Sequence, residues 1–377
     1  MNWLVSSSSK ELRVNLLLEA KDSQSCTGSN RFGAFRVSLL EGVTTLALLG
    51  DAEEGSERKR MLADSLMDIL AFVSDGRGFL ERDVDVSVFE TVTRVIGSLL
   101  SIHDITEGSI PSYHSQLLDK EQRKTLLEAA TLLGQRLLPA FASPFDLPYP
   151  SINLITQTVP LKEGADTSVS QAGTALLEFS HLSALSGEHQ FRQRAEGAAI
   201  GLFHQRNLET GLFGSRLMVE TGQWKDARAT MGTETASYFE YLCKYPHLLR
   251  PQSGKLASRW QRVWVPVKEA LEKLQNGPRW EDAHMATQQV LEPHEPLLGA
   301  IWPSFMVLHR NLGEAERSFQ AIMSLWQRRT ALATTSPDGS SNISAKGVLL
   351  PPPELAESAF YLFRATGRLK YQYAGSL

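Results

Sequence analysis

Carboxylates are the side chains of this sequence whose types and spacing could do chemistry. Glu90 stands four residues before Arg94, and Glu354 and Glu357 follow the prolines at 351–353. A carboxyl group can give a proton to a reacting atom, or take one from it, when the fold holds it within hydrogen-bonding reach. These glutamates are therefore candidates for general acid and base chemistry.

The spacing by itself favours a structural role for the same residues. Glu90 and Arg94 can pair on the surface of a helix, which contributes a few tenths of a kcal/mol. Glu354 and Glu357 fall in the first turn of a helix that begins after the prolines, where the helix dipole favours negative charge. Both interpretations stay open at the level of spacing.

Other chemistries are disfavoured by motifs that the sequence lacks. It contains no glycine-rich phosphate loop of the Walker type, no dinucleotide fingerprint, no His-Glu-x-x-His pair and no nucleophile elbow. The nine histidines are scattered, and a lone one such as His103 or His181 is more readily structural than catalytic. Nucleotide-binding, zinc-protease and serine-hydrolase functions are therefore disfavoured.

Composition is that of an ordinary globular protein. Of the 377 residues, 42% are apolar and 21% are charged, and the net charge of −4 gives no reason to expect a nucleic-acid partner. Cys26 and Cys243 lie far apart in the sequence, so they predict neither a metal cluster nor a disulfide framework. The apolar run at the N-terminus is too short for a signal peptide or a membrane span.

Helical periodicity dominates the chain, and strand patterns are scarce. The pattern predicts an all-α protein with two long connections, 142–169 and 334–352. The predicted helices span residues 58–74, 86–103, 119–138, 170–186, 188–205, 235–249, 256–274, 281–290, 296–310, 313–330 and 353–366.

Several short blocks, in order along the chain, carry a family resemblance. They include SLLEGVTTLALLG at 38–50, VFETVTRVIGSLLS at 88–101, SYFEY at 237–241, Trp302-Pro303 and the Pro353-Glu354 block. The order and spacing resemble glycoside hydrolase family 47, the class I α-1,2-mannosidases, and most of all their endoplasmic-reticulum degradation-enhancing branch.

The resemblance implies an (α/α) barrel, a toroid of helix pairs. We expect an irregular segment over 1–30 and a barrel domain over 31–377 that is incomplete at both ends. The implied function is to trim or to recognise high-mannose N-glycans of misfolded glycoproteins in the endoplasmic reticulum. Two alternatives stay open: a catalytically impaired mannose-binding relative, and a helical interaction scaffold that is not an enzyme.

The resemblance also assigns roles to individual residues. Glu90 is the expected catalytic acid and Glu354 the expected base, and an inverting glycosidase holds such groups about 6.5–9.5 Å apart. No metal ligand is assigned. The expected substrate-binding residues are Arg94, Glu178, Trp224, Tyr238, Glu240 and Glu357.

Departures from the family pattern bear on catalysis. The family carries a catalytic-centre Asp just before its Ser-Tyr-x-Glu-Tyr block, and that position here is Ala236. The resemblance implies a calcium cofactor, but the chain stops at Leu377, before the segment in which the family carries a calcium-binding Thr. We therefore expect hydrolysis to be impaired and calcium binding to be weak.

Overall fold

The computed structural model describes residues 35–49, 57–107, 117–160, 164–249, 253–277, 279–291, 297–335 and 352–374. Within these ranges the chain is mainly helical, and each strand is two or three residues long. The predicted irregular segment 1–30 and most of the predicted connection 334–352 lie outside the described residues.

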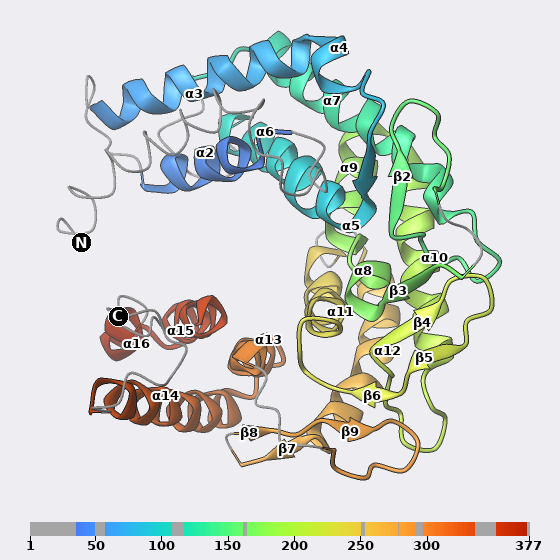
Figure 1. Ribbon diagram of the computed structural model, residues 1–377. Coiled ribbons are helices and arrows are strands. Elements are labelled where there is room, and N and C mark those ends of the chain that lie inside the picture. Colours follow the sequence, from blue (N-terminus) through green and yellow to red (C-terminus); the bar gives the residue numbers. More distant parts are fainter. Residues whose placement is uncertain are drawn as a thin grey trace. The chain divides into compact units, whose positions relative to one another are not determined.

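Figure 1 shows the helices and strands of the chain. The chain divides into two compact units. Unit 1 comprises Met1–Thr167, Gln171–Leu202 and Met218–Gly222, and unit 2 comprises Ser168–Ser170, Phe203–Leu217 and Gln223–Leu377.

Unit 1 is built from helices that pack in pairs. Helix α2 packs against α3 and α6, and α7 packs against α3, α6 and α9. Apolar stripes such as Leu126, Leu133 and Leu137 of α7 are fully buried, which is what joins these helices. The helices of this unit are α2 (Val37–Leu49), α3 (Glu57–Ser74), α4 (Gly76–Phe79), α5 (Val88–Glu90), α6 (Gly97–Glu107), α7 (Lys120–Leu137), η3 (Leu138–Phe141), α9 (Leu176–Ser186) and most of α10 (His189–Gln205).

A π-helical segment, η2 (Thr91–Ile96), joins α5 to α6. The Ser87 hydroxyl accepts a hydrogen bond from the backbone N–H of Glu90 and so caps α5. Ser87 ends strand β1 (Asp85–Ser87), which pairs with β2 (Ser151–Asn153) in antiparallel register. Short π-helical segments inside longer helices are frequent at functional sites, and this one lies next to Glu90 and contains Arg94.

Unit 2 is also helical, with a core of large aromatic residues. Trp264, Trp302 and Phe305 are fully buried and meet edge to face. Helix α11 packs against α12 and α13, and α15 packs against η4, α13, α14 and α16. The helices are α11 (Ala236–Leu249), α12 (Gly254–Glu272), η4 (Leu297–Ile301), α13 (Trp302–Leu308), α14 (Leu312–Thr335), α15 (Pro353–Thr366) and α16 (Leu369–Ala374).

Short strand pairs connect these helices. Strand β4 (Arg216–Met218) pairs with β5 (Trp224–Asp226), β6 (Arg228–Ala229) with β9 (Ala283–His284), and β7 (Gln275–Asn276) with β8 (Arg279–Trp280), all antiparallel. The remaining short elements are strand β3 (Asp166–Ser168) and helix α8 (Val169–Gly173).

The helix predicted over 281–290 is wrong. Ala283 and His284 form β9, Ala283 also forms a bridge with Val290, and the backbone N–H of His284 donates to the carbonyl of Gln289. Pairing with β6 therefore overrides the helical spacing of the apolar residues in this range. The other predicted helical ranges do contain helices, and the structure adds α2, α4 and α16, which the periodicity did not predict.

Candidate functional site

In unit 1, the predicted acid Glu90 is held by an arginine. Arg94 Nε lies 2.5 Å from Glu90 Oε2, and Arg94 Nη1 lies 3.1 Å from Glu41 Oε1 of α2. Hydrogen bonding to Glu90 is the main cause that raises the pKa of Arg94. The Glu90 side chain is 25% exposed and that of Arg94 43%. The predicted structural pairing of Glu90 with Arg94 is thus present, and Glu90 is half-buried.

Glu178, a predicted substrate-binding residue, approaches α6 at a glycine. A Cβ atom placed on Gly97 would stand 3.4 Å from Glu178 Cγ. A Cβ atom at residue 97 would therefore be in van der Waals contact with Glu178. Glu178 is half-buried on α9, which packs against both α6 and η2.

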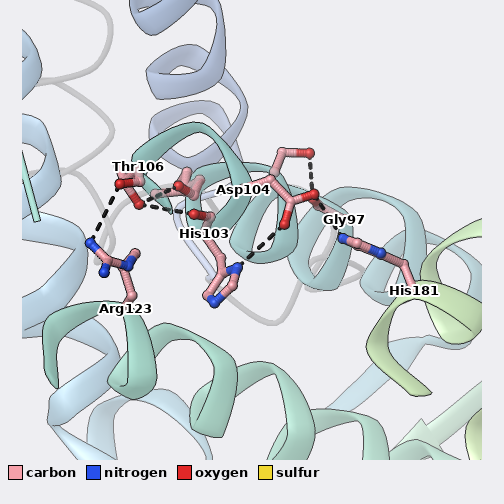
Figure 2. Close-up of polar contacts among 8 residues, drawn as sticks. Gly97, His103, Asp104, Thr106, Arg123 and His181 are labelled. Atoms are coloured by element: carbon pink, nitrogen blue, oxygen red, sulfur yellow. Dashed lines mark hydrogen bonds and ion pairs between the residues drawn. The ribbon is translucent and has the colours of Figure 1, made fainter. Parts of the chain in front are cut away.

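Asp104 of α6 contacts two histidines, its neighbour His103 and His181 of α9, and the second contact joins the two helices (Figure 2). His181 Nε2 lies 2.8 Å from Asp104 Oδ2, and His103 Nδ1 lies 3.3 Å from Asp104 Oδ1. Burial opposes ionisation of Asp104, but hydrogen bonds from the two histidines outweigh it and lower its pKa to about 2. The same contact with Asp104 raises the pKa of His181.

The C-terminal turn of α6 is fixed by further hydrogen bonds, also drawn in Figure 2. The buried Thr106 hydroxyl donates to the carbonyl of Ile102 at 2.7 Å, and Arg123 of α7 donates to the carbonyl of Thr106 at 3.4 Å. Sequence reasoning expected structural roles for His103 and His181, and it missed that Asp104 unites them. In the described part of the chain, His103, Asp104 and Glu107 are also the one group spaced closely enough to share a metal ion.

In unit 2, a lysine brings together two of the predicted substrate-binding carboxylates. Lys244 Nζ of α11 lies 2.5 Å from Glu240 Oε1 and 2.6 Å from Glu357 Oε1 of α15. Burial alone would lower the pKa of Lys244, but the two carboxylates reverse this and raise it. Burial is the main cause that raises the pKa of Glu240, and Glu357 and Glu354 add to the effect.

Glu354, the predicted base, belongs to the same group of charges. It lies in the first turn of α15, is half-buried, and acts electrostatically on Glu240. Pro352 and Pro353 start the helix, as the sequence predicted. Unit 2 therefore gathers Glu240 and Glu357 around one ammonium group, with Glu354 acting electrostatically on Glu240. We call these four residues the Lys244 cluster.

Ala236 is the first residue of α11 and is buried. The nearest acidic residue along the chain, Glu234, precedes the helix, and its carboxylate lies 2.9 Å from Arg216 Nη1 of β4. That carboxylate is thus committed to Arg216. It does not stand in for a carboxylate at position 236.

Tyr238 and Trp224, the two aromatic residues predicted to bind substrate, differ in burial. Tyr238 is fully buried among Phe213 and Phe239, a placement that favours core packing over sugar contact. The half-buried Trp224 donates its indole N–H to the carbonyl of Gln205 at 2.9 Å. Its ring covers Gly214, where a Cβ atom would come within 2.5 Å of the indole. Roles of both residues in binding stay predictions.

Comparison with known proteins decides the family. The family model described as Glycosyl hydrolase family 47 matches residues 19–376. The chain belongs to glycosyl hydrolase family 47. This membership confirms the resemblance carried by the blocks around Glu90, Glu240 and Glu354.

Relatives in this family cover most of the chain. It is 32% identical over 363 residues to alpha-mannosidase I MNS4 of Arabidopsis thaliana, covering 93% of this chain and 53% of the relative. It is also 32% identical over 349 residues to the human ER degradation-enhancing alpha-mannosidase-like protein 2, covering 91% of this chain and 56% of the relative. The chain thus spans just over half the length of these relatives.

A solved structure of the family shares the fold. The alpha-1,2-mannosidase from Trichoderma reesei aligns with a TM-score of 0.69 at 21% identity, over 90% of this chain and 74% of that one. This likeness confirms the predicted all-α, (α/α) barrel fold class. No helix in the described ranges combines the length and the apolar character needed to cross a bilayer.

Calcium, which the family resemblance implies, does not fit the Lys244 cluster. Calcium takes six to eight oxygen ligands. Among the described residues of this cluster, Glu240 and Glu357 both accept from the Lys244 ammonium, whose positive charge would repel a second cation. The cluster is therefore built around a cation that the chain itself supplies.

Proposed function

We propose that this chain recognises α-1,2-linked mannose on high-mannose N-glycans of misfolded glycoproteins, as a mannosidase-like protein of endoplasmic-reticulum-associated degradation. Its hydrolytic activity is at or near background. Support for the ligand comes from the family and from relatives whose names describe alpha-mannosidases and ER degradation.

The charged groups of each unit suit a neutral, hydroxyl-rich ligand. A carboxylate accepts hydrogen bonds from sugar hydroxyls, and a cation beside it keeps it ionised. Glu90 beside Arg94 in unit 1, and Glu240 and Glu357 beside Lys244 in unit 2, are such carboxylates, and all three are half-buried. Half-burial removes competing water while leaving the oxygens within reach of a ligand.

Ala236 is the observation that favours binding over hydrolysis. The family resemblance places a catalytic-centre carboxylate at this position, and the methyl group of alanine cannot activate water. Glu234 is bound to Arg216 and does not replace it. General acid or base help contributes about 10²–10⁴-fold in rate, so loss of one group is enough to bring turnover close to background.

A titration with a high-mannose oligosaccharide tests the proposal. The unmodified chain should bind the oligosaccharide, and Glu354→Gln should weaken the binding. Glu272→Gln is the matched control, because Glu272 is an exposed acceptor of a lysine ammonium outside the cluster. Absence of binding by the unmodified chain would contradict the proposed ligand.

Release of free mannose from the same oligosaccharide separates binding from catalysis. We expect release near background from the unmodified chain. Turnover by Ala236→Asp, but not by the unmodified chain, would assign the loss to this position. Robust turnover by the unmodified chain that survives Glu354→Gln would overturn the roles given to both residues.

An interaction scaffold is the second candidate, and one surface favours it. Phe360, Leu369 and Tyr373 of α15 and α16 are 59%, 57% and 69% exposed. Glu90, Glu178 and Glu354 are nevertheless half-buried, whereas a scaffold that makes no use of them would leave them exposed. Sedimentation of the chain with Phe360→Ser as a comparison would detect association through this surface.

A further inference from the structure

Lys244 of α11 joins carboxylates from two helices of unit 2. It contacts Glu240 of its own helix at 2.5 Å and Glu357 of α15, 113 residues away in sequence, at 2.6 Å. Its side chain is 21% exposed, and those of Glu240 and Glu357 are 27% and 32% exposed. Each carboxylate has a second oxygen besides the one that accepts from Lys244. Those two oxygens are the groups with which the cluster could accept further donors.

The charges around Lys244 do not balance. Glu354 and Glu357 both act electrostatically on Glu240, whereas the one ammonium, that of Lys244, acts on Glu240 and Glu357. The other titratable groups that feel these charges are Cys243 of α11 and Tyr361 of α15. Burial raises the pKa of both, so both are neutral at neutral pH. Lys244 therefore supplies the positive charge that offsets the repulsion between the glutamates.

Without that charge the carboxylates could not all stay ionised. Like charges that share a partly buried site raise one another's pKa until one group holds a proton. A protonated carboxyl presents one donor where the site had an acceptor. The protonation state of the pair therefore decides how many of its oxygens can only accept hydrogen bonds from ligand hydroxyls.

We propose that Lys244 is a positioning residue that fixes Glu240 and Glu357 as two ionised acceptors for the hydroxyls of a neutral sugar. The sugar as ligand rests on the proposed function, whereas the fixed charge of the pair does not. Lys244 itself donates to the carboxylates and is not assigned a contact with the sugar.

The first experiment needs no sugar. Difference infrared spectroscopy at neutral pH counts protonated carboxyl groups in Lys244→Met relative to the unmodified chain. We expect Lys244→Met to gain about one protonated carboxyl group, and Lys244→Arg, which keeps the charge, to gain none. Lys268→Met is the matched control, because Lys268 contacts Glu272 at 2.6 Å with the four-residue spacing of Lys244 and Glu240 and is equally exposed, but contacts a single carboxylate. It should also gain none.

If Lys244→Met does not fold, Lys244→Gln replaces it, since the amide keeps a donor but loses the charge. The same gain of one protonated carboxyl group is expected. A folded Lys244→Met or Lys244→Gln protein with no protonated carboxyl group would overturn the inference, because a merely structural lysine would leave the pair ionised.

The second experiment measures affinity for the high-mannose oligosaccharide against pH. Lys244→Met should bind at least about tenfold more weakly at neutral pH and recover as the pH rises and the extra proton leaves. Lys244→Arg should restore most of the affinity. If the unmodified chain binds no oligosaccharide, the proposed function fails, and the infrared result still decides the role of Lys244.

Discussion

Two groups of charges, one in each unit, have the same arrangement of a cation between two carboxylates and differ in burial. In unit 1, Glu90 pairs with Arg94 four residues later, and Arg94 also reaches Glu41. In unit 2, Glu240 pairs with Lys244 four residues later, and Lys244 also reaches Glu357. The cation is 43% exposed in unit 1 and 21% exposed in unit 2.

This difference shows that equal geometry does not mean equal energy. Exposed ion pairs contribute about 0–1 kcal/mol, because water competes with both partners. Removing one partner of a buried pair costs more, since the other charge is left without compensation. We therefore expect the lysine of unit 2 to matter to stability and the arginine of unit 1 to matter little.

The largest expected effect is that of Lys244→Met. Loss of the ammonium leaves Glu240 and Glu357 facing each other, and the free energy of unfolding should fall by about 3 kcal/mol. Chemical denaturation at neutral pH measures it. Lys268 is 21% exposed like Lys244, but its partner Glu272 is 40% exposed, so Lys268→Met should lose less than about 1 kcal/mol. Equal losses in the two variants would break the comparison.

Asp104→Asn should have the next largest effect, with a defined pH dependence. The folded-state pKa of Asp104 is about 2, against 3.8 in its ordinary state, a difference worth about 2 kcal/mol. This contribution is present above pH 3.8 and is lost as the pH falls through about 2.

His181 makes the same stability contribution decrease at high pH. Its pKa is raised above 6.5, so its contribution is full below pH 6.5 and is lost as the pH rises through the folded-state value. The stability difference between the unmodified chain and Asp104→Asn should thus be greatest between pH 4 and 6. A difference that does not vary from acidic to alkaline pH would show that the contact carries no charge.

Glu240→Gln should destabilise much less than Lys244→Met, by no more than about 1 kcal/mol. The substitution removes a carboxylate whose burial is unfavourable, and Lys244 keeps Glu357 as its partner. Because the pKa of Glu240 is raised above 4.5, the carboxylate costs stability as the pH rises through that range. The free energy of unfolding, measured from pH 4 to 7, should therefore decrease less steeply with pH in Glu240→Gln than in the unmodified chain.

Arg94→Met should have the smallest effect on stability, roughly 0.5 kcal/mol, since its guanidinium is partly exposed. Added salt should reduce the difference further. The free-energy loss from Lys244→Met, in contrast, should persist in added salt. A loss from Arg94→Met as large as that from Lys244→Met would mean that exposure does not separate the two groups.

The sequence by itself determined most of the helices, the family and the pairing of Glu90 with Arg94. Apolar residues at helical spacing predicted α7, α11 and α15, and the spacing of Glu90 and Arg94 predicted their pairing. Ordered blocks identified the family, which the match over residues 19–376 confirmed. These features are visible because they depend on residues within a few turns of one another.

Only the tertiary structure decided which residue from a distant part of the sequence joins each charged group. Arg94 and Glu41 lie 53 residues apart, His181 and Asp104 77, and Lys244 and Glu357 113. Pairing between strands also overrode the helical pattern at 281–290. Periodicity records which face of a helix is apolar, but not which helix will cover that face. The charge that a buried glutamate holds depends on that second helix.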